Sequence, residues 1–296
     1  MSVSVTSQQE LDALISLLDD NDTEVVDIVE KKLKSLGKEY ISALENSLHE
    51  CHNFIVQTKI EEIIVDINSI DLKEALQTWI ANDSGLLEAA YVISRFENNT
   101  QIEIKHFNLK VERITRSIWL EMTNYLTPLE RIKVIENILY KVYNLKGSKS
   151  NYTKVDNFLI TDVIEKLSGN GITNSILYII LAQMLDLPVR GFKYNDTIIL
   201  AWYSHEFLFD YEHNQKTNNF NNIKIFIDPL SGKGFSHLDM QYLLTVNETG
   251  FNDNIFKPLN NKEIIEILLI EYSKCFTQHF HHKYTTLNRI ISELFY

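Results

Sequence analysis

Cysteine, proline and glycine are scarce in this chain of 296 residues, which contains two cysteines, four prolines and nine glycines. The cysteines, Cys51 and Cys275, are too few for a disulfide framework and fit a reducing compartment. So few prolines and glycines leave few sharp turns, which favours a fold built mainly of helices. Long apolar runs are also missing, because the most apolar stretches, such as residues 176–185, fall short of the roughly 18 residues that a membrane span requires.

Positive charge is in deficit as well, with 28 Lys and Arg against 40 Asp and Glu and a net charge of −12. Such a surface repels phosphate groups, so we expect neither a nucleic-acid partner nor an anionic membrane. Residues 1–6 contain no basic cluster and no apolar core, which predicts that a secretory signal is absent. These features together predict a cytoplasmic protein.

The residues that are present predict an N-terminal array of helices. Hydrophobic residues make up 45% of the chain, which excludes disorder for most of it. From residue 7 to about 96 they recur at helical spacing in segments of three or four turns. Asp22 is placed to cap one helix, and Gly37 stands where that helix ends. Helices this short must stack on their neighbours, as in helical repeats, so we expect a first domain over residues 1–83.

Further helices are predicted up to about residue 185, and the hydrophobic period then changes to that of strands. Thr127, Pro128 and Glu130 form a strong helix start. Three β-branched and aromatic runs follow, and we expect strands at 197–203, 207–209 and 224–227. Two helices at 261–270 and 272–294 are expected to close the fold as a hairpin. Helices, a small antiparallel sheet and more helices make an α+β arrangement.

The segment from Leu167 to Gly191 resembles the transglutaminase-like superfamily, and specifically the bacterial SirB-type proteins. Its framework matches are Ser175, Tyr178, Leu185, Leu187, Pro188 and Gly191. The run from Thr197 to Trp202 corresponds to the strand that bears the family's histidine, and the run from Phe226 to Pro229, with Gly232, corresponds to the strand that ends in its aspartate. The helix from Leu86 to Phe96 resembles the one that opens the family's core.

The resemblance implies a papain-like core over residues 84–245, with C-terminal helices at 246–296 packed on it. In such a core a cysteine at a helix N-terminus faces a histidine and an aspartate on the sheet. Counting from Leu187 places the cysteine position at Gly171 and the histidine position at Thr197, and only Asp228 keeps its family identity. Glycine has no side chain to act as a nucleophile, and threonine is no base near neutral pH. The inherited chemistry is therefore predicted to be lost.

Two functions from different classes follow. The first is a non-catalytic protein that binds a protein or peptide, or another ligand, and uses no cofactor; Asn170, Thr173 and Asn174 are its candidate cleft residues. The second is a hydrolase or acyltransferase with a rebuilt site, in which His205 acts as a displaced base beside Asp228 and a hydroxyl, that of Ser175 or Thr173, replaces the nucleophile. Asp228 is also explained as an ordinary turn residue before proline, and Thr173 as a capping residue.

A metal site is a third candidate. On one continuous helix, Cys275, His279 and His282 would share a face, and thiolate and imidazole ligands suit zinc. Histidines near a helix C-terminus are also favoured by the helix dipole, so the spacing alone does not require a metal.

Overall fold

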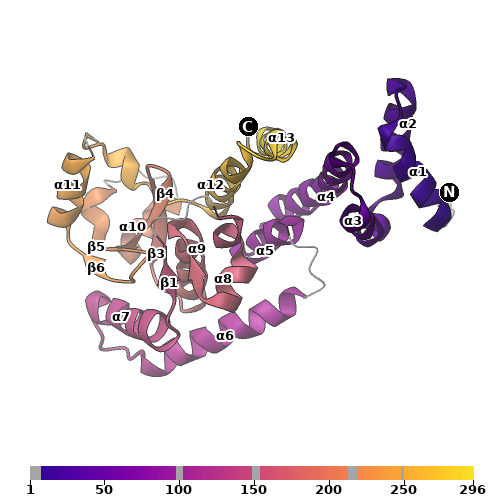
Figure 1. The fold of residues 1–296 in the computed structure, drawn as a ribbon. Helices are drawn as coiled ribbons and strands as arrows, with labels where there is room; N and C mark the ends of the chain where they lie inside the picture. The colour runs from indigo at the N-terminus through magenta and orange to yellow at the C-terminus, as the bar shows by residue number, and fades with distance from the viewer. Residues whose placement is uncertain (1–7, 98–102, 149–153, 213–218, 248–249) are drawn as a thin grey trace. The chain divides into compact units, whose positions relative to one another are not determined.

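The computed structural model describes residues 8–97, 103–148, 154–212, 219–247 and 250–296, and these residues are mostly helical (Figure 1). The chain forms two compact units. One comprises residues 1–78 and 276–294 and the other residues 79–275, with the last two residues divided between them. This grouping places α12 (Asn261–Ser273) in the second unit and α13 (His281–Phe295) in the first.

The first unit is a stack of helices with its own apolar core. Its helices are α1 (Gln8–Ser16), α2 (Thr23–Leu36), α3 (Ile41–Glu50), most of α4 (Phe54–Asn82) and α13. The core gathers the buried aliphatic side chains that give α1 to α4 their helical spacing, among them Leu11, Leu33, Ile41 and Ile60. The predicted ends of α2 are confirmed, because Asp22 accepts a hydrogen bond from the Glu24 amide and Gly37 has a φ of 77°.

The length of α4 corrects the expectation that every N-terminal helix has only three or four turns. This helix has 29 residues, because no glycine or proline interrupts it before the turn at Asp83, whose φ is 47°. Despite that length, no helix in the described ranges is apolar enough to cross a membrane.

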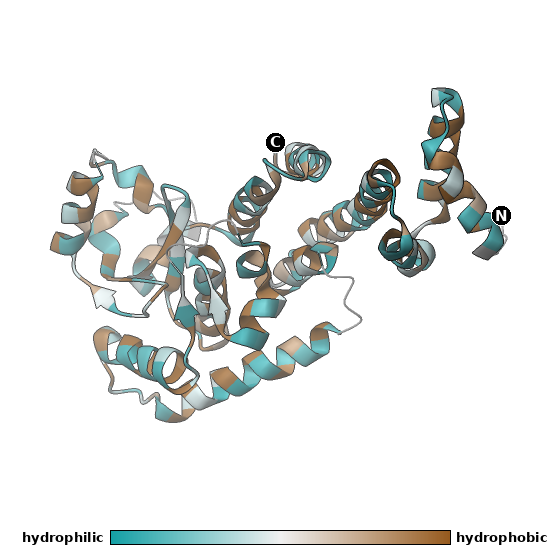
Figure 2. Ribbon diagram, in the orientation of Figure 1, coloured by the Kyte–Doolittle hydropathy of each residue, from teal (hydrophilic) through white to brown (hydrophobic). Residues whose placement is uncertain are grey.

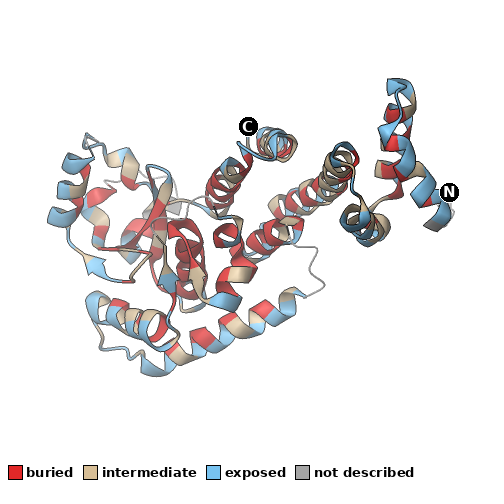
Figure 3. Ribbon diagram, viewed as in Figure 1, coloured by how far each residue is buried: buried red, intermediate tan, exposed pale blue. Residues whose placement is uncertain are grey.

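The second unit surrounds α9 (Gly171–Met184), which is largely hydrophobic (Figure 2). Its first twelve residues are all buried (Figure 3). The helices of this unit besides α9 and α12 are α5 (Leu86–Glu97), α6 (Ile104–Glu121), α7 (Pro128–Ile135), the π-helix η3 (Glu136–Val142), α8 (Ile160–Lys166), α10 (His205–Glu212) and α11 (His237–Val246). The helix start predicted at Thr127 is confirmed as a capping box with Glu130.

A four-stranded antiparallel sheet covers one side of α9. Its strands lie in the order β3 (Val189–Tyr194), β4 (Thr197–Tyr203), β5 (Ile223–Ile227) and β6 (Gly234–Phe235). A short parallel pair, β1 (Lys146–Gly147) and β2 (Ser168–Gly169), lies just before the start of α9. The predicted α+β order and the strand at 197–203 are confirmed.

The run at 207–209 was expected as a strand and is part of α10 instead. The Ser204 hydroxyl accepts a hydrogen bond from the Phe207 amide and so starts a helix there. The aromatic residues of the run serve a helix face equally well, because Phe207 stacks on Tyr203 and is buried against the sheet. The helix expected at 272–294 is also shorter than predicted. A 3₁₀ turn (Lys274–Phe276) and a further turn precede α13, which begins at His281.

Candidate functional site

The first turn of α9, where the resemblance places a nucleophile, is closed and held by its own polar residues. Gly171 is its first residue and is buried. Asn170 caps the helix, with its side-chain oxygen 2.9 Å from the Ile172 nitrogen and 3.0 Å from the Thr173 nitrogen. The Thr173 hydroxyl accepts from the Asn170 amide and donates to the Asn157 carbonyl at 2.7 Å. The capping interpretation of Thr173 therefore agrees with its hydrogen bonds.

Asn170, Asn174 and Tyr178 form a buried polar stripe along α9. They are spaced four residues apart, so they lie on one side of the helix. Asn174 donates to the Lys146 carbonyl of β1 at 3.4 Å. Each member of the stripe keeps one polar atom without a hydrogen-bond partner in the described part of the chain, namely Asn170 Nδ2, Asn174 Oδ1 and the Tyr178 hydroxyl. The stripe is polar but fully enclosed, so it is no open cleft.

Thr197 lies on the face of the sheet that points away from α9. Its strand neighbours Ile199, Ala201 and Tyr203 belong to the cluster on that face, together with Met240 of α11. A Cβ added to Gly191 would contact both Ile198 and Ile179 of α9. The Ile198 side chain therefore lies on the other face of the sheet, the one that packs against α9. Since side chains alternate along a strand, Thr197 shares the face of Ile199. The positions counted for the family's cysteine and histidine are thus separated by the sheet.

Asp228 follows β5, and its carboxylate is used within the turn that it starts. Oδ1 accepts from the Leu230 amide at 3.0 Å and Oδ2 from the Ser231 hydroxyl at 2.6 Å. The Gly232 amide closes the turn onto the Asp228 carbonyl at 2.7 Å. These bonds favour the interpretation of Asp228 as a turn residue, because both carboxylate oxygens already have donors.

The Asp228 turn packs on Tyr140 of the π-helix. The Tyr140 hydroxyl donates to the Pro229 carbonyl at 2.8 Å. A Cβ on Gly232, whose φ is 71°, would lie 2.4 Å from the Tyr140 ring, so only glycine fits. Burial raises the pKa of Tyr140 well above its ordinary value, and the nearby Tyr178 and Asp228 raise it further. Burial, aided by Glu136, also raises the pKa of Tyr178. Both phenols stay neutral and serve as packing groups at neutral pH.

His205 lies at the opposite end of the β-ladder from Asp228. Leu200 pairs with Ile227, next to Asp228, whereas Tyr203 at the other end pairs with Ile223. His205 follows Tyr203 by two residues, so about 15–20 Å of strand separates it from Asp228. The histidine is exposed at the start of α10. The pair that the rebuilt-enzyme hypothesis requires is therefore not formed.

No replacement nucleophile is open to solvent at the start of α9. Thr173 and Ser175 are both fully buried. The Ser175 hydroxyl donates to the Ile198 carbonyl at 2.9 Å and so ties α9 to the sheet.

The C-terminal Cys and His residues do not share one helix. Cys275 lies in the 3₁₀ turn after α12, His279 in the following turn and His282 in α13. The prediction that these three residues share one helix face is wrong, because the helix is interrupted between Cys275 and His282. Burial raises the pKa of the Cys275 thiol to about 11, helped by the charge of Glu97. Throughout the described ranges, no three His, Cys, Asp or Glu residues are grouped to hold a metal ion.

A groove opens on the sheet face opposite α9, beside the Asp228 turn. Its volume is about 580 Å³, and its apolar lining includes Ile199, Pro229, Phe235, Tyr242 and Leu243. Leu238, Tyr242 and Val246 of α11 continue the apolar surface at spacings of four residues. Leu238 is 76% exposed and Tyr242 is 69% exposed. We call these lining and stripe residues the α11 groove.

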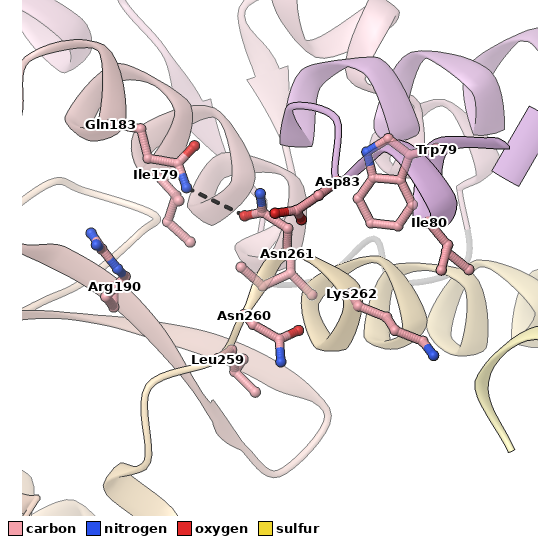
Figure 4. A pocket seen from close by; sticks show the side chains of 11 residues that line it. Trp79, Ile80, Asp83, Ile179, Gln183, Arg190, Leu259, Asn260, Asn261 and Lys262 are labelled. Carbon is pink, nitrogen blue, oxygen red and sulfur yellow. Dashed lines mark hydrogen bonds between the residues drawn. The ribbon is translucent and has the colours of Figure 1, made fainter. Parts of the chain in front are cut away.

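A separate cavity of about 450 Å³ lies among the end of α4, α9, β3 and the start of α12 (Figure 4). Gln183 and Asn261 join across it by a hydrogen bond of 3.3 Å. The three positions that correspond to the family's catalytic residues do not line this cavity, and neither does His205. Those positions are Gly171, Thr197 and Asp228.

Comparison with known protein families gives a match over part of this chain. The model of the transglutaminase-like superfamily matches residues 105–270, more than half of the chain. The chain belongs to the transglutaminase-like superfamily. No curated protein and no solved structure matches it. The narrower likeness to SirB-type proteins stays a prediction.

The superfamily match covers α9, the sheet and the Asp228 turn. Sequence reasoning had proposed Asn170, Thr173 and Asn174 as cleft residues, and they lie together but are enclosed. It missed Tyr140 and the α11 groove. The groove had a signal in the sequence, namely the apolar spacing of Leu238, Tyr242 and Val246. Tyr140 had none, because it reaches the turn only through the tertiary fold.

Proposed function

We propose that this protein is a non-catalytic member of the transglutaminase-like superfamily that binds a segment of another protein in the α11 groove. The observation that carries the proposal is where the three positions that correspond to the family's cysteine, histidine and aspartate lie in the structure. Gly171 has no side chain, Thr197 lies on the sheet face that points away from α9, and both carboxylate oxygens of Asp228 already accept hydrogen bonds within its turn. A nucleophile, a base and an orienting carboxylate must meet within hydrogen-bond reach, and these positions do not.

The groove supports binding as the remaining role. Folding normally removes apolar side chains from water, yet α11 keeps Leu238, Tyr242 and Val246 exposed in one row. An exposed apolar row beside a concave surface is typical of a site for another protein. Tyrosine in particular is enriched among residues that dominate binding energy, because it buries a large ring and still offers a hydroxyl.

The test is a selection of binders from a displayed library of random 12-residue peptides on the immobilised full chain. Peptides that bind the α11 groove are expected to lose at least tenfold in affinity when Leu238 and Tyr242 are both replaced by serine. The matched control replaces Leu120 and Tyr125, which are also exposed, by serine. If no peptide distinguishes the groove variant from this control, binding at the α11 groove is refuted.

A further inference from the structure

A second pocket lies in the first unit, between α4 and the segment that leads into α13. Phe54, Thr58, Glu61, Glu62 and Val65 form one wall, and their spacing of four, seven, eight and eleven residues marks one face of α4. Residues 279–283 form the other wall. The pocket has a volume of about 470 Å³, which is enough for a large side chain. We call it the α4 pocket.

Two aromatic rings of the α4 pocket face solvent. Phe54 is 78% exposed and Phe280 is 50% exposed. Exposed phenylalanines around a concave surface indicate a partner that covers them. Flat aromatic faces attract cations, and the planar guanidinium group of arginine stacks on them particularly well.

Neither carboxylate of this pocket forms an ion pair within the described part of the chain, although the charge of Glu62 contributes to raising the pKa of Lys34. Glu61 and Glu62 are half-buried, and the described residues provide neither an ion pair nor a hydrogen bond to their side chains. Asp66, also on α4, is paired by contrast, since it lies 2.8 Å from both Lys34 Nζ and His282 Nε2. Two adjacent unpaired carboxylates on one wall repel each other, and a bound cation would relieve that repulsion.

The lysine and one histidine of the opposite wall are already engaged. Lys283 Nζ lies 4.4 Å from the centre of the Phe276 ring, and His282 is bound to Asp66. They therefore form no ion pair with Glu61 or Glu62. Lys34, which Glu62 attracts, has its ion pairs with Asp66 and Glu30 instead. A metal is not the missing cation, because no described trio of His, Cys, Asp or Glu is grouped to ligate one.

The charge of the whole first unit favours the same kind of partner. Residues 1–78 and 276–294 contain 17 Asp and Glu but only 8 Lys and Arg, whereas the whole chain has 40 and 28. This unit thus carries most of the net charge of −12 on about a third of the chain. Such a field attracts basic segments and speeds their encounter.

We propose that the α4 pocket binds an arginine side chain presented by a basic segment of another protein. The guanidinium group lies against Phe54 and Phe280 and donates hydrogen bonds to Glu61 and Glu62. Charge-assisted hydrogen bonds of a guanidinium to carboxylates are stronger and more specific than those of a lysine, which selects arginine. This site is separate from the α11 groove and does not depend on it.

The test uses the same displayed library on the full chain, now compared with the variant E61Q/E62Q. Peptides that contain arginine beside apolar residues are expected to be enriched on the native chain. Their affinity is expected to fall at least tenfold on E61Q/E62Q, by fluorescence anisotropy at fixed salt. The matched control E50Q/E74Q removes two exposed acids of the same unit outside the pocket and should change affinity less than twofold.

Replacing the arginine of the strongest peptide by citrulline, a neutral residue of the same shape, is expected to cost at least tenfold as well. Equal loss on E61Q/E62Q and E50Q/E74Q would mean general attraction to an acidic surface and would overturn the proposal. Absence of arginine among the selected peptides, or full retention with citrulline, would also overturn it. The serine variants of the α11 groove leave these peptides unaffected, so the two proposals fail or succeed separately.

Discussion

The start of α9 and the α4 pocket use polar side chains in opposite ways. At the start of α9, Asn170 and Thr173 are buried and their oxygens hold backbone groups. In the α4 pocket, Glu61 and Glu62 are half-exposed, and no described residue forms an ion pair or a hydrogen bond with their carboxylates. Polar groups that satisfy the backbone maintain a fold, whereas accessible and uncompensated ones remain available to a ligand. In this chain the start of α9, which lies within the superfamily match, is of the first kind.

The largest effect is expected from Gly232→Ala, which disturbs the contact between the Asp228 turn and Tyr140. The new methyl group would lie 2.4 Å from the ring at a positive φ, so the free energy of unfolding should fall by about 3 kcal/mol. Urea denaturation followed by circular dichroism measures this change. Gly85→Ala is the control, because its methyl group would have no atom within 4 Å. Equal stability of both variants would show that the turn is not fixed on Tyr140.

A smaller loss is expected from Asn170→Ala, which removes the cap of α9. Two backbone amides inside the protein would lose their acceptor, so we expect a loss of about 2 kcal/mol. Thr127→Ala removes an exposed capping box from α7, where water can replace the lost bonds, and should cost about 1 kcal/mol. Thermal unfolding of both variants gives the comparison, and the reverse order would contradict the structural role of Asn170.

Asp66 lies on the same helix as Glu61 and Glu62, but its carboxylate is ion-paired. Burial opposes its ionisation, but hydrogen bonds from Lys34 and His282 outweigh burial and lower the pKa of Asp66 below its ordinary value. The folded state therefore gains stability above the unfolded pKa of about 4, and this gain is lost as the pH falls through the folded pKa. Asp66→Asn should cost about 1 kcal/mol at pH 7 and measurably less at pH 3, which lies below the unfolded pKa. Stability that differs equally at both pH values would contradict this assignment.

The smallest effect is expected from E61Q/E62Q on stability. Neither carboxylate has an ion pair or hydrogen bond to lose in the described structure, and Glu62 adds only an attraction to Lys34 without a direct contact. The free energy of unfolding should therefore stay within about 0.5 kcal/mol of the native chain. The same urea titration measures it. A large loss would mean that these acids belong to the fold rather than to a binding site.

Much of this architecture could be predicted from the sequence, because it depends on local signals. The strand at 197–203, the Asp228 turn and the cap at Thr127 each follow from short-range chemistry. The prediction of a strand at 207–209 was wrong because its aromatic residues suit a strand and a buried helix face equally well. The π-helix leaves no periodic signature, since it adds only one residue to a turn.

The candidate site was less predictable because it depends on register and packing. Counting along the chain gave Thr197 a catalytic position, but the strand register puts its side chain on the far face of the sheet. His205 lies only eight residues beyond Thr197, and the ladder still carries it away from Asp228. Contacts such as that of Tyr140 with Pro229 join residues 89 positions apart, which no local pattern records.

The most direct test of the central claim is an assay of turnover on the purified chain. Amide, ester and glutamine acyl-donor substrates are incubated with the native chain and with Asp228→Asn. We expect no turnover above buffer for either protein, because no nucleophile meets a base at the start of α9. Turnover by the native chain that disappears in a folded Asp228→Asn variant would contradict the account and restore an active site at this turn.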